Sequence, residues 1–397
     1  MNASVESCEV DLSDHSRWMA LAIQLARKGL YTTHPNPRVG CVLVKDGQLV
    51  GQGWHQYAGQ GHAEVNALRD AGGLAQGATA YVTLEPCCHT GKTPPCTRAL
   101  IEARVSRVVV AMQDPNPLVA GNGLEILRQQ GIAVLSGILE QESRALNPGF
   151  IQRMTHQRPW VRCKMAMSLD GRTALRNGQS KWITGPAARA DVQRWRAQSS
   201  AILTGINTVL ADDPSMNVRL SDWLGERPER WQNQADVFQP ALVVLDSQLR
   251  VPHQAKIFTA ARKNWIVTTP SESGATSSNS VVQASKHQLL ADQGAEVVTL
   301  KSSGAGVDLP ALLTFLAQQE INELWVESGA ALAGQMAQLN LVDEYIIYIA
   351  SKLMGSHAQP LLNLPEYQSM GDIPQLLWQD VRQIGDDLRV IAKPIQQ

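Results

Sequence analysis

One histidine, one glutamate and two cysteines stand in an order that is typical of a catalytic zinc site. Glu64 follows two residues after His62, and Cys87 and Cys96 come later in the chain. An imidazole and two thiolates give Zn²⁺ three protein ligands, and a catalytic zinc keeps its fourth position for water. Glu64 can take a proton from that water and deliver it to a ring nitrogen and to the leaving ammonia. The pattern therefore indicates hydrolytic deamination.

The spacing of the two cysteines differs from the general pattern of nucleobase deaminases. In that pattern two residues separate the cysteines that follow the His-x-Glu element, whereas eight residues separate Cys87 from Cys96 here. A structural zinc site with four protein ligands is the alternative, and Cys88 or His89 would supply the fourth ligand. Adjacent residues rarely reach one ion in tetrahedral geometry, which argues against Cys88 beside Cys87, and we expect His89 to lie near the substrate or simply in a loop. We therefore expect His62, Cys87 and Cys96 to be the ligands.

The elements that position these residues alternate between strands and helices, which is typical of an α/β domain. Helical stretches begin at His62 and just after Pro94 and Pro95, close to Cys96. The start of a helix stabilises negative charge and lowers the pKa of a cysteine, which suits thiolate ligands. The other expected helices span 16–28, 123–131 and 139–147, and the expected strands span 39–44, 49–54, 78–84, 105–112 and 132–137.

The alternation restarts after residue 158, which predicts a second domain. We expect an N-terminal tail over 1–13, a deaminase domain over 14–147, a linker over 148–158 and the second domain over 159–397. Residues 271–280 are typical of a polar surface loop, and 220–240 of an irregular insertion. Strands are expected at 159–169, 201–205, 241–246, 264–269, 296–300, 323–327 and 344–350, a hairpin over 380–393, and helices at 186–197, 308–319 and 330–339.

Composition narrows the class of protein. Of the 397 residues, 44% are apolar, and the net charge is −1. Nucleic-acid binders usually carry a basic excess, so we expect no nucleic-acid partner. The chain has no apolar run long enough to span a membrane, and its acidic, polar start does not resemble a signal peptide. We therefore expect a cytoplasmic protein with no membrane partner.

Four segments of the first half closely resemble the bacterial family of bifunctional riboflavin biosynthesis proteins. They are THPNPRVGCVLV (33–44), GHAEVNAL (61–68), YVTLEPCCHTGKTPPC (81–96) and QDPNP (113–117). The resemblance implies a cytidine-deaminase-like domain layered α/β/α, with zinc on the three ligands above and Glu64 as acid and base. It implies deamination of 2,5-diamino-6-ribosylamino-4(3H)-pyrimidinone 5′-phosphate. Asn36 is the expected contact to the pyrimidine ring, because its amide can both donate and accept hydrogen bonds.

Five segments of the second half resemble the reductase half of the same family. They are KMAMSLDGRTA (164–174), SKWITG (180–185), TVLADDPSMNVR (208–219), VVLDSQLR (243–250) and LWVESGAALAG (324–334). The resemblance implies a dihydrofolate-reductase-like α/β domain that uses NADPH to reduce 5-amino-6-(5-phosphoribosylamino)uracil to the ribitylamino product. It also implies a homo-oligomer, a dimer or larger.

The resemblance assigns two sets of contacts in this second half. The cofactor contacts are Ala166, Trp182, Thr208, Asp212, Ser247, Gly329, Ala330, Ala331, Leu332, Ala333, Gly334 and Gln335. The substrate contacts are Lys164, Ser180, Arg196, Met216, Arg219 and Glu327.

The chemistry of these residues is consistent with the two sets of contacts, but it would not identify either set without the resemblance. Arg196 and Arg219 can each offer paired donors to a ribose phosphate, and Glu327 can hold sugar hydroxyls. Lys164 or Asp212 could promote opening of the sugar ring, and Ser247 and Arg250 are candidate contacts to a 2′-phosphate. Each residue also fits a structural role, and the turn after residue 327 has no Gly-x-Gly-x-x-Gly motif.

Two other functions compete with the bifunctional enzyme. A deaminase of nucleic acid or free cytidine would carry a basic surface or aromatic stacking platforms. A non-catalytic zinc protein of the same fold would lack Glu64 or the two arginines, and all three residues are present.

Overall fold

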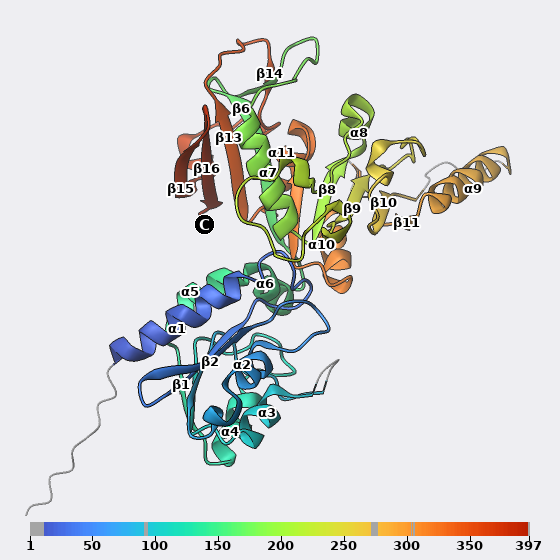
Figure 1. Cartoon of the computed structure of the whole chain (residues 1–397). Coiled ribbons are helices and arrows are strands. Elements are labelled where there is room, and N and C mark those ends of the chain that lie inside the picture. Colours follow the sequence, from blue (N-terminus) through green and yellow to red (C-terminus); the bar gives the residue numbers. More distant parts are fainter. Residues whose placement is uncertain (1–11, 91–93, 271–276, 303, 305, 396–397) are drawn as a thin grey trace, which may run out of the picture. The chain divides into compact units, whose positions relative to one another are not determined.

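The computed structural model describes residues 12–90, 94–270, 277–302, 304 and 306–395 (Figure 1). The chain divides into two compact units, Met1–His156 and Gln157–Gln397. The expected tail, 1–13, lies almost entirely outside the described residues, and helix α1 begins at Leu12. Within the described residues, no helix is long and apolar enough to cross a membrane.

The first unit is built on a five-stranded sheet in the order β2-β1-β3-β4-β5. Strand β1 runs antiparallel to β2 and β3, whereas β3, β4 and β5 run parallel. The strands are β1 (Gly40–Lys45), β2 (Gln48–Trp54), β3 (Thr79–Val82), β4 (Arg107–Val110) and β5 (Ala133–Ser136). The helices are α1 (Leu12–Arg27), α2 (Ala63–Ala71), α3 (Cys96–Glu102), α4 (Asn122–Gln129), α5 (Glu140–Leu146) and α6 (Pro148–His156), with a 3₁₀ turn η1 (Gly72–Ala75).

Helices cover both faces of this sheet. Successive side chains of a strand point to opposite faces, and β1 shows this clearly. Cys41 and Leu43 pack in the core that contains α2, α3 and α4. Val42 and Val44 pack in the opposite core with α1 and α5. The predicted α/β/α layering is therefore confirmed.

Helix α2 lies very close to β2. A Cβ atom at Gly53 would lie 2.4 Å from Ala67 N and 2.6 Å from Ala63 O, both backbone atoms of α2. Any larger residue would have to push the helix away from the sheet. Because Glu64 is in the first turn of α2, this close packing also fixes the position of the expected acid and base.

Residues 148–158, expected as a linker, contain helix α6. Its Phe150 is buried with Leu84 and Met112 in a small apolar cluster of the first unit. This helix is therefore part of the first compact unit, which ends at His156.

The second unit is built on a nine-stranded sheet in the order β11-β10-β9-β8-β12-β6-β13-β16-β15. In this order, all the strands from β11 through β13 run parallel to one another. Strand β16 pairs antiparallel with β13, and β15 pairs antiparallel with β16. They are β6 (Trp160–Ser168), β8 (Ala201–Gly205), β9 (Ala241–Leu245), β10 (Asn264–Thr268), β11 (Ala295–Thr299), β12 (Glu323–Glu327), β13 (Glu344–Ala350), β15 (Leu376–Ile384) and β16 (Asp387–Pro394). Strands β7 (Arg172–Ala174) and β14 (Gln359–Pro360) pair separately.

Apolar cores lie on both faces of this sheet as well. In β8, Leu203 belongs to one core and Ile202 to the other. The helices are α7 (Pro186–Gln198), α8 (Ile206–Asp212), α9 (Ser277–Asp292), α10 (Leu309–Gln318) and α11 (Ala330–Gln338). The 3₁₀ turns are η2 (Leu220–Asp222), η3 (Gln234–Asp236), η4 (Lys256–Phe258) and η5 (Met370–Asp372).

The structure differs from the sequence prediction at one polar segment. Residues 277–280, expected to be a loop, begin helix α9, and residues 271–276 lie outside the described residues. In the expected insertion at 220–240, Trp223 and Trp231 are buried against each other with their rings edge to face. This contact gives the insertion a small apolar centre of its own.

Candidate functional site

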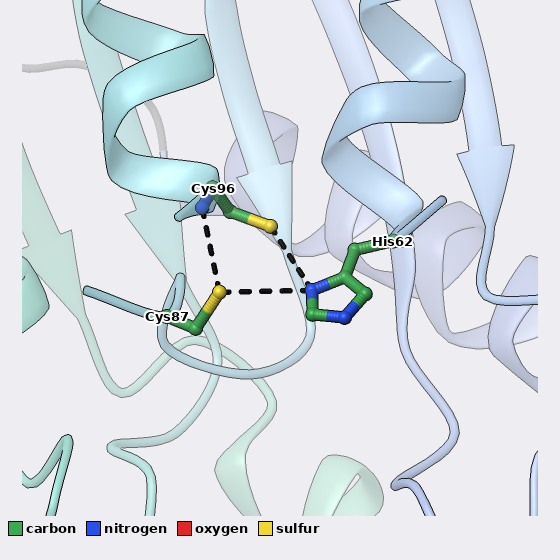
Figure 2. Close-up of side chains that lie close together, drawn as sticks. All are labelled: His62, Cys87 and Cys96. Carbon is green, nitrogen blue, oxygen red and sulfur yellow. Dashed lines mark hydrogen bonds between the residues drawn. The ribbon is translucent and has the colours of Figure 1, made fainter. Parts of the chain in front are cut away.

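The three expected zinc ligands converge in the first unit (Figure 2). His62 Nδ1 lies 3.2 Å from Cys96 Sγ and 3.6 Å from Cys87 Sγ. Their ligand atoms lie within 4.8 Å of one another, and in the part of the chain that the structure describes no other His, Cys, Asp or Glu completes the group. One nitrogen and two sulfur donors fit Zn²⁺.

Helix starts position two of the three ligands. His62 immediately precedes α2, and Cys96 is the first residue of α3. The Cys96 N–H donates to Cys87 Sγ at 3.3 Å, as expected for a thiolate at the start of a helix. The hydrogen bond from Cys96 is the main cause that lowers the pKa of Cys87 to about 4. The same contact raises the pKa of Cys96, and a bound metal ion would need both sulfurs as thiolates.

Glu64 is buried beside these ligands, with 3% of its surface exposed. Burial is the main cause that raises the pKa of its carboxyl group to about 7, and the carboxyl group also interacts with the side chains of His62 and Cys96. A general acid and base works best when its pKa lies near the working pH. The position and the pKa of Glu64 therefore suit proton transfer at this site.

Cys88 and His89, the alternative fourth ligands, lie apart from the three-residue group. The Cys88 thiol donates to Leu118 O at 3.8 Å, and burial raises its pKa. His89 is exposed. Neither side chain closes the coordination shell.

His55 fixes the orientation of Asn36. His55 Nδ1 lies 3.2 Å from Gly61 O, and a carbonyl oxygen can only accept, so Nδ1 carries the proton. Burial lowers the pKa of His55, which favours the neutral ring with Nε2 as an acceptor. Asn36 Nδ2 therefore donates to Nε2 at 3.1 Å. This leaves Asn36 Oδ1 as the acceptor for a ring N–H. His55 was not among the site residues predicted from the sequence, where its only signal was a histidine close to the His62 segment.

Glu85 braces the loop that carries Cys87. It is 3% exposed, and its two carboxylate oxygens accept hydrogen bonds from four backbone N–H groups. The donors are Asp114, Gly121, Gly123 and Leu124. A Cβ atom at Gly123 would lie 2.2 Å from Pro86 O, so the start of α4 packs directly on the ligand loop. Glu85 was not predicted to have a role, and its only signal in the sequence was an acidic residue next to Pro86 and Cys87.

In the second unit, three expected substrate residues form one buried cluster. Glu327 and Lys164 are directly paired on β12 and β6. Arg196, from α7, donates to the two carboxylate oxygens of Glu327 at 2.6 and 2.9 Å, and Trp325 Nε1 donates to Oε1 at 2.7 Å. Burial raises the pKa of Glu327 as the first cause, but the charge and hydrogen bonds of Arg196 outweigh it and hold the pKa at about 2. The carboxylate is therefore ionised and fixed in direction.

Of the other expected substrate contacts, Arg219 is linked to this cluster through Asp222. Arg219 pairs with Asp222 at 2.7 Å, and Asp222 also interacts electrostatically with Arg196. The Met216 side chain is buried in an apolar core, and its backbone oxygen accepts a hydrogen bond from Arg262. Ser180 is partly exposed between β7 and α7.

The expected cofactor residues lie on several elements at the carboxyl end of the parallel strands, where ligands bind in α/β sheets. Asp212 of α8 pairs with Lys181 at 3.0 Å, which brings the Trp182 segment beside the helix of Thr208. Trp182 is 64% exposed, and the Arg189 guanidinium lies over its ring at 4.5 Å. Ser247 follows β9, and Ala166 lies within β6.

The expected turn at 329–335 begins α11. Gly329 precedes the helix, and among the described residues the buried Ser328 Oγ just before it has no hydrogen-bond partner. Such an atom fits a polar cofactor. Ala333 and Gly334 are buried, whereas Gly329 and Ala331 are exposed. The first turn of the helix is thus the accessible part.

Two family models match this chain. The model of the cytidine and deoxycytidylate deaminase zinc-binding region matches residues 12–112, and the model of the RibD C-terminal domain matches residues 159–390. The riboflavin biosynthesis protein RibD of Escherichia coli strain K12 is 47% identical over 371 residues, which is 94% of this chain and 97% of that protein. RibD of Haemophilus influenzae is 46% identical over 381 residues, 95% of this chain and 96% of that protein.

Solved structures agree with these matches. The solved structure of Acinetobacter baumannii RibD, form 1, shares 46% identity, with a TM-score of 0.86, over 97% of this chain and 100% of that chain. A diaminohydroxyphosphoribosylaminopyrimidine deaminase/5-amino-6-(5-phosphoribosylamino)uracil reductase from Thermotoga maritima shares 31% identity, with a TM-score of 0.79, over 97% and 99% of the two chains. This chain therefore belongs to the RibD family of riboflavin biosynthesis proteins, with a zinc-binding deaminase domain followed by a reductase domain.

Proposed function

We propose that this chain catalyses two consecutive steps of riboflavin biosynthesis. The first is hydrolytic deamination of 2,5-diamino-6-ribosylamino-4(3H)-pyrimidinone 5′-phosphate. The second is reduction of 5-amino-6-(5-phosphoribosylamino)uracil by NADPH to the ribitylamino product. The observation that carries the first step is a group of three zinc ligands beside a buried carboxyl group.

In the deaminase step, zinc supplies a Lewis acid that makes bound water a better nucleophile when the metal is present. Glu64 accepts one proton from the attacking water and delivers it to the ring nitrogen. It then transfers the remaining hydroxyl proton to the departing amino group, which leaves as ammonia. Asn36, held by His55, presents its oxygen to a ring N–H and orients the pyrimidine. The side chains of Glu64 and Asn36 thus hold the pyrimidine ring, and with it the reacting carbon, in one orientation.

In the reductase step, NADPH supplies a hydride to C1′ of the sugar. Reduction needs the open-chain imine, so a proton donor near the sugar promotes the reaction. We assign this role to Lys164, which lies beside Glu327 in the buried cluster. Glu327, oriented by Arg196, accepts hydrogen bonds from the sugar hydroxyls, and Arg219 holds the phosphate.

Removal of zinc is expected to stop the first step and spare the second. After dialysis against a chelator, ammonia release from the diaminopyrimidine phosphate should fall to background, because the first step needs zinc. The three zinc ligands belong to the first site alone. NADPH oxidation with the deaminated substrate should continue at the original rate. Added zinc should restore ammonia release. The proposed first step would be wrong if the chelated protein still released ammonia from the diaminopyrimidine phosphate. It would also be wrong if the zinc-loaded protein released ammonia from cytidine as readily.

We place the enzyme in the cytoplasm, where reducing conditions keep both cysteine ligands as thiols.

We further propose that the protein is a homodimer that pairs through β15. In the part of the chain that the structure describes, this strand is an edge strand of the nine-stranded sheet, and it exposes Leu377, Trp378 and Val381. An exposed apolar edge strand is a template for pairing with another chain. Two copies of β15 can pair antiparallel about a two-fold axis, which is the commonest symmetry of soluble oligomers.

Trp378→Glu is expected to convert the dimer into a monomer. Trp378 is 64% exposed in the single chain, so the change costs little inside the fold but places a charge in the paired edge. Sedimentation velocity should give twice the chain mass for the unmodified protein and the chain mass for the variant. Leu224→Glu, a change at another exposed leucine of the second unit, should leave the dimer intact. A monomeric unmodified protein would exclude this interface.

A further inference from the structure

The guanidinium group of Arg219 is almost fully occupied by partners from its own segment of the chain. Its Nε and Nη2 lie 2.8 and 2.7 Å from one carboxylate oxygen of Asp222. Its Nη1 donates to Ser215 Oγ at 3.3 Å and to Asn217 Oδ1 at 3.2 Å. A guanidinium group has five N–H donors, so these contacts leave one of them for a ligand. A paired contact with a phosphate needs two donors, and Arg219 can make it only by releasing a present partner.

The backbone around Arg219 is anchored to α7. Arg219 N donates to Gln193 Oε1 at 3.0 Å, and Arg196 Nη1 donates to Asn217 O at 3.0 Å. Gln193 and Arg196 both belong to α7, and their spacing places them on one face of that helix. The side chains of Arg219 and Asp222, in contrast, are 37% and 39% exposed. Arg219 can therefore change partners by side-chain rotation while the loop stays in place.

Asp222 is a charged competitor at this arginine. Burial raises its pKa as the first cause, but the hydrogen bond and the charge of Arg219 outweigh burial, and the pKa lies below the ordinary value of 3.8. The charge of Arg196 lowers the pKa further. The carboxylate is thus ionised at neutral pH, and it accepts hydrogen bonds from the same N–H groups that a phosphate would need. The two anions also repel each other, so both cannot hold Arg219 in this way at once.

We infer that Asp222 competes with the phosphate of the substrate for Arg219 and so sets the affinity of the reductase site for its phosphorylated ligands. This inference rests on the proposed function, which assigns the phosphate to Arg219. Substrate and product carry the same phosphate, so an interaction with it stabilises both complexes and lowers KM without raising kcat. Asp222 offsets part of this uniform binding. It gives way when the substrate enters, and it pairs with Arg219 again as the product leaves.

Asp222→Asn tests this competition, because the amide keeps the shape of the carboxylate and removes its charge. KM for the deaminated substrate is measured by NADPH oxidation, and Kd of the ribitylamino product by isothermal titration calorimetry on the full chain. Both constants should fall by about twofold to fivefold, as expected when a partly exposed ion pair no longer opposes binding. The constants for the dephosphorylated substrate and product should not change. Asp372→Asn, at an exposed aspartate that likewise ends a 3₁₀ turn, should change none of these constants.

Other results would overturn the inference in distinguishable ways. A raised KM in Asp222→Asn would show that Asp222 orients Arg219 for the phosphate, and an unchanged KM would show that the two anions do not compete. An equal fall of KM in an Arg219→Met background, or for the dephosphorylated substrate, would show that Asp222 acts on something other than the contact between Arg219 and the phosphate. If the unmodified protein oxidised no NADPH with the deaminated substrate, the proposed reductase step would be wrong and the inference would fail with it.

Discussion

Glu64→Gln is expected to lower the rate of deamination by about 10²–10⁴-fold, the usual range for loss of a general acid and base. The substitution keeps the size of a buried side chain and removes only its ability to exchange a proton. Ammonia release from the diaminopyrimidine phosphate measures the loss. NADPH oxidation with the deaminated substrate should be unchanged, because Glu64 belongs to the first unit and the reductase residues to the second.

Two controls separate chemistry from metal loss. The zinc content of the Glu64→Gln protein should equal that of the unmodified protein, because Glu64 is not one of the three ligands. Glu125→Gln, at a more than half-exposed glutamate of the same unit, should retain full deamination. Deamination by Glu64→Gln at the normal rate would remove the basis for the proposed mechanism.

Lys164→Met is expected to lower the reductase kcat by about 10²–10⁴-fold while deamination stays unchanged, because the substitution removes the proposed proton donor and keeps an unbranched side chain. Burial lowers the pKa of Lys164 from its ordinary value of 10.5, and the charge of Glu327 opposes this effect only in part. The donor must be protonated to act. The reductase rate of the unmodified protein should therefore decline with rising pH at a value below 10.5.

The matched control is Lys263→Met, at a lysine of the same unit whose side chain is 52% exposed. This variant should keep both the reductase rate and its alkaline decline. If Lys164→Met lost both activities, the role of Lys164 would be structural. If the alkaline decline persisted in a still active Lys164→Met protein, another group would be the donor.

The two sites differ in how far the sequence reveals them. The zinc ligands are rare residue types in two short segments, and helix starts near His62 and Cys96 could be read directly. The reductase residues are common types spread over β6, α7, α8, β9, β12 and α11. Local spacing cannot predict that Arg196 meets Glu327, because 131 positions separate them and only the sheet order joins them. For that half the resemblance supplied the candidates.

The fold shows the same contrast between strong and weak local signals. The buried parallel strands were predicted because burial on both faces produces continuous apolar runs, as in β9 and β10. Helix α8 was missed because it has only seven residues and follows a strand without a break. Helix α9 was missed because its first turns are polar and show no apolar period. The roles of His55 and Glu85 depend on contacts made across the fold, which no local pattern encodes.

The hydrogen bonds of Glu85 bear on how the protein acquires its metal. Four backbone amides bound to one buried carboxylate fix the ligand loop by contacts that involve none of the three ligands. A zinc finger folds only as it captures its ion. Here the four hydrogen bonds of Glu85 hold the loop from within the chain, so we expect the domain to keep its fold when zinc is removed. A folded molecule that lost its ion during scarcity would then be reloaded without passing through an unfolded state.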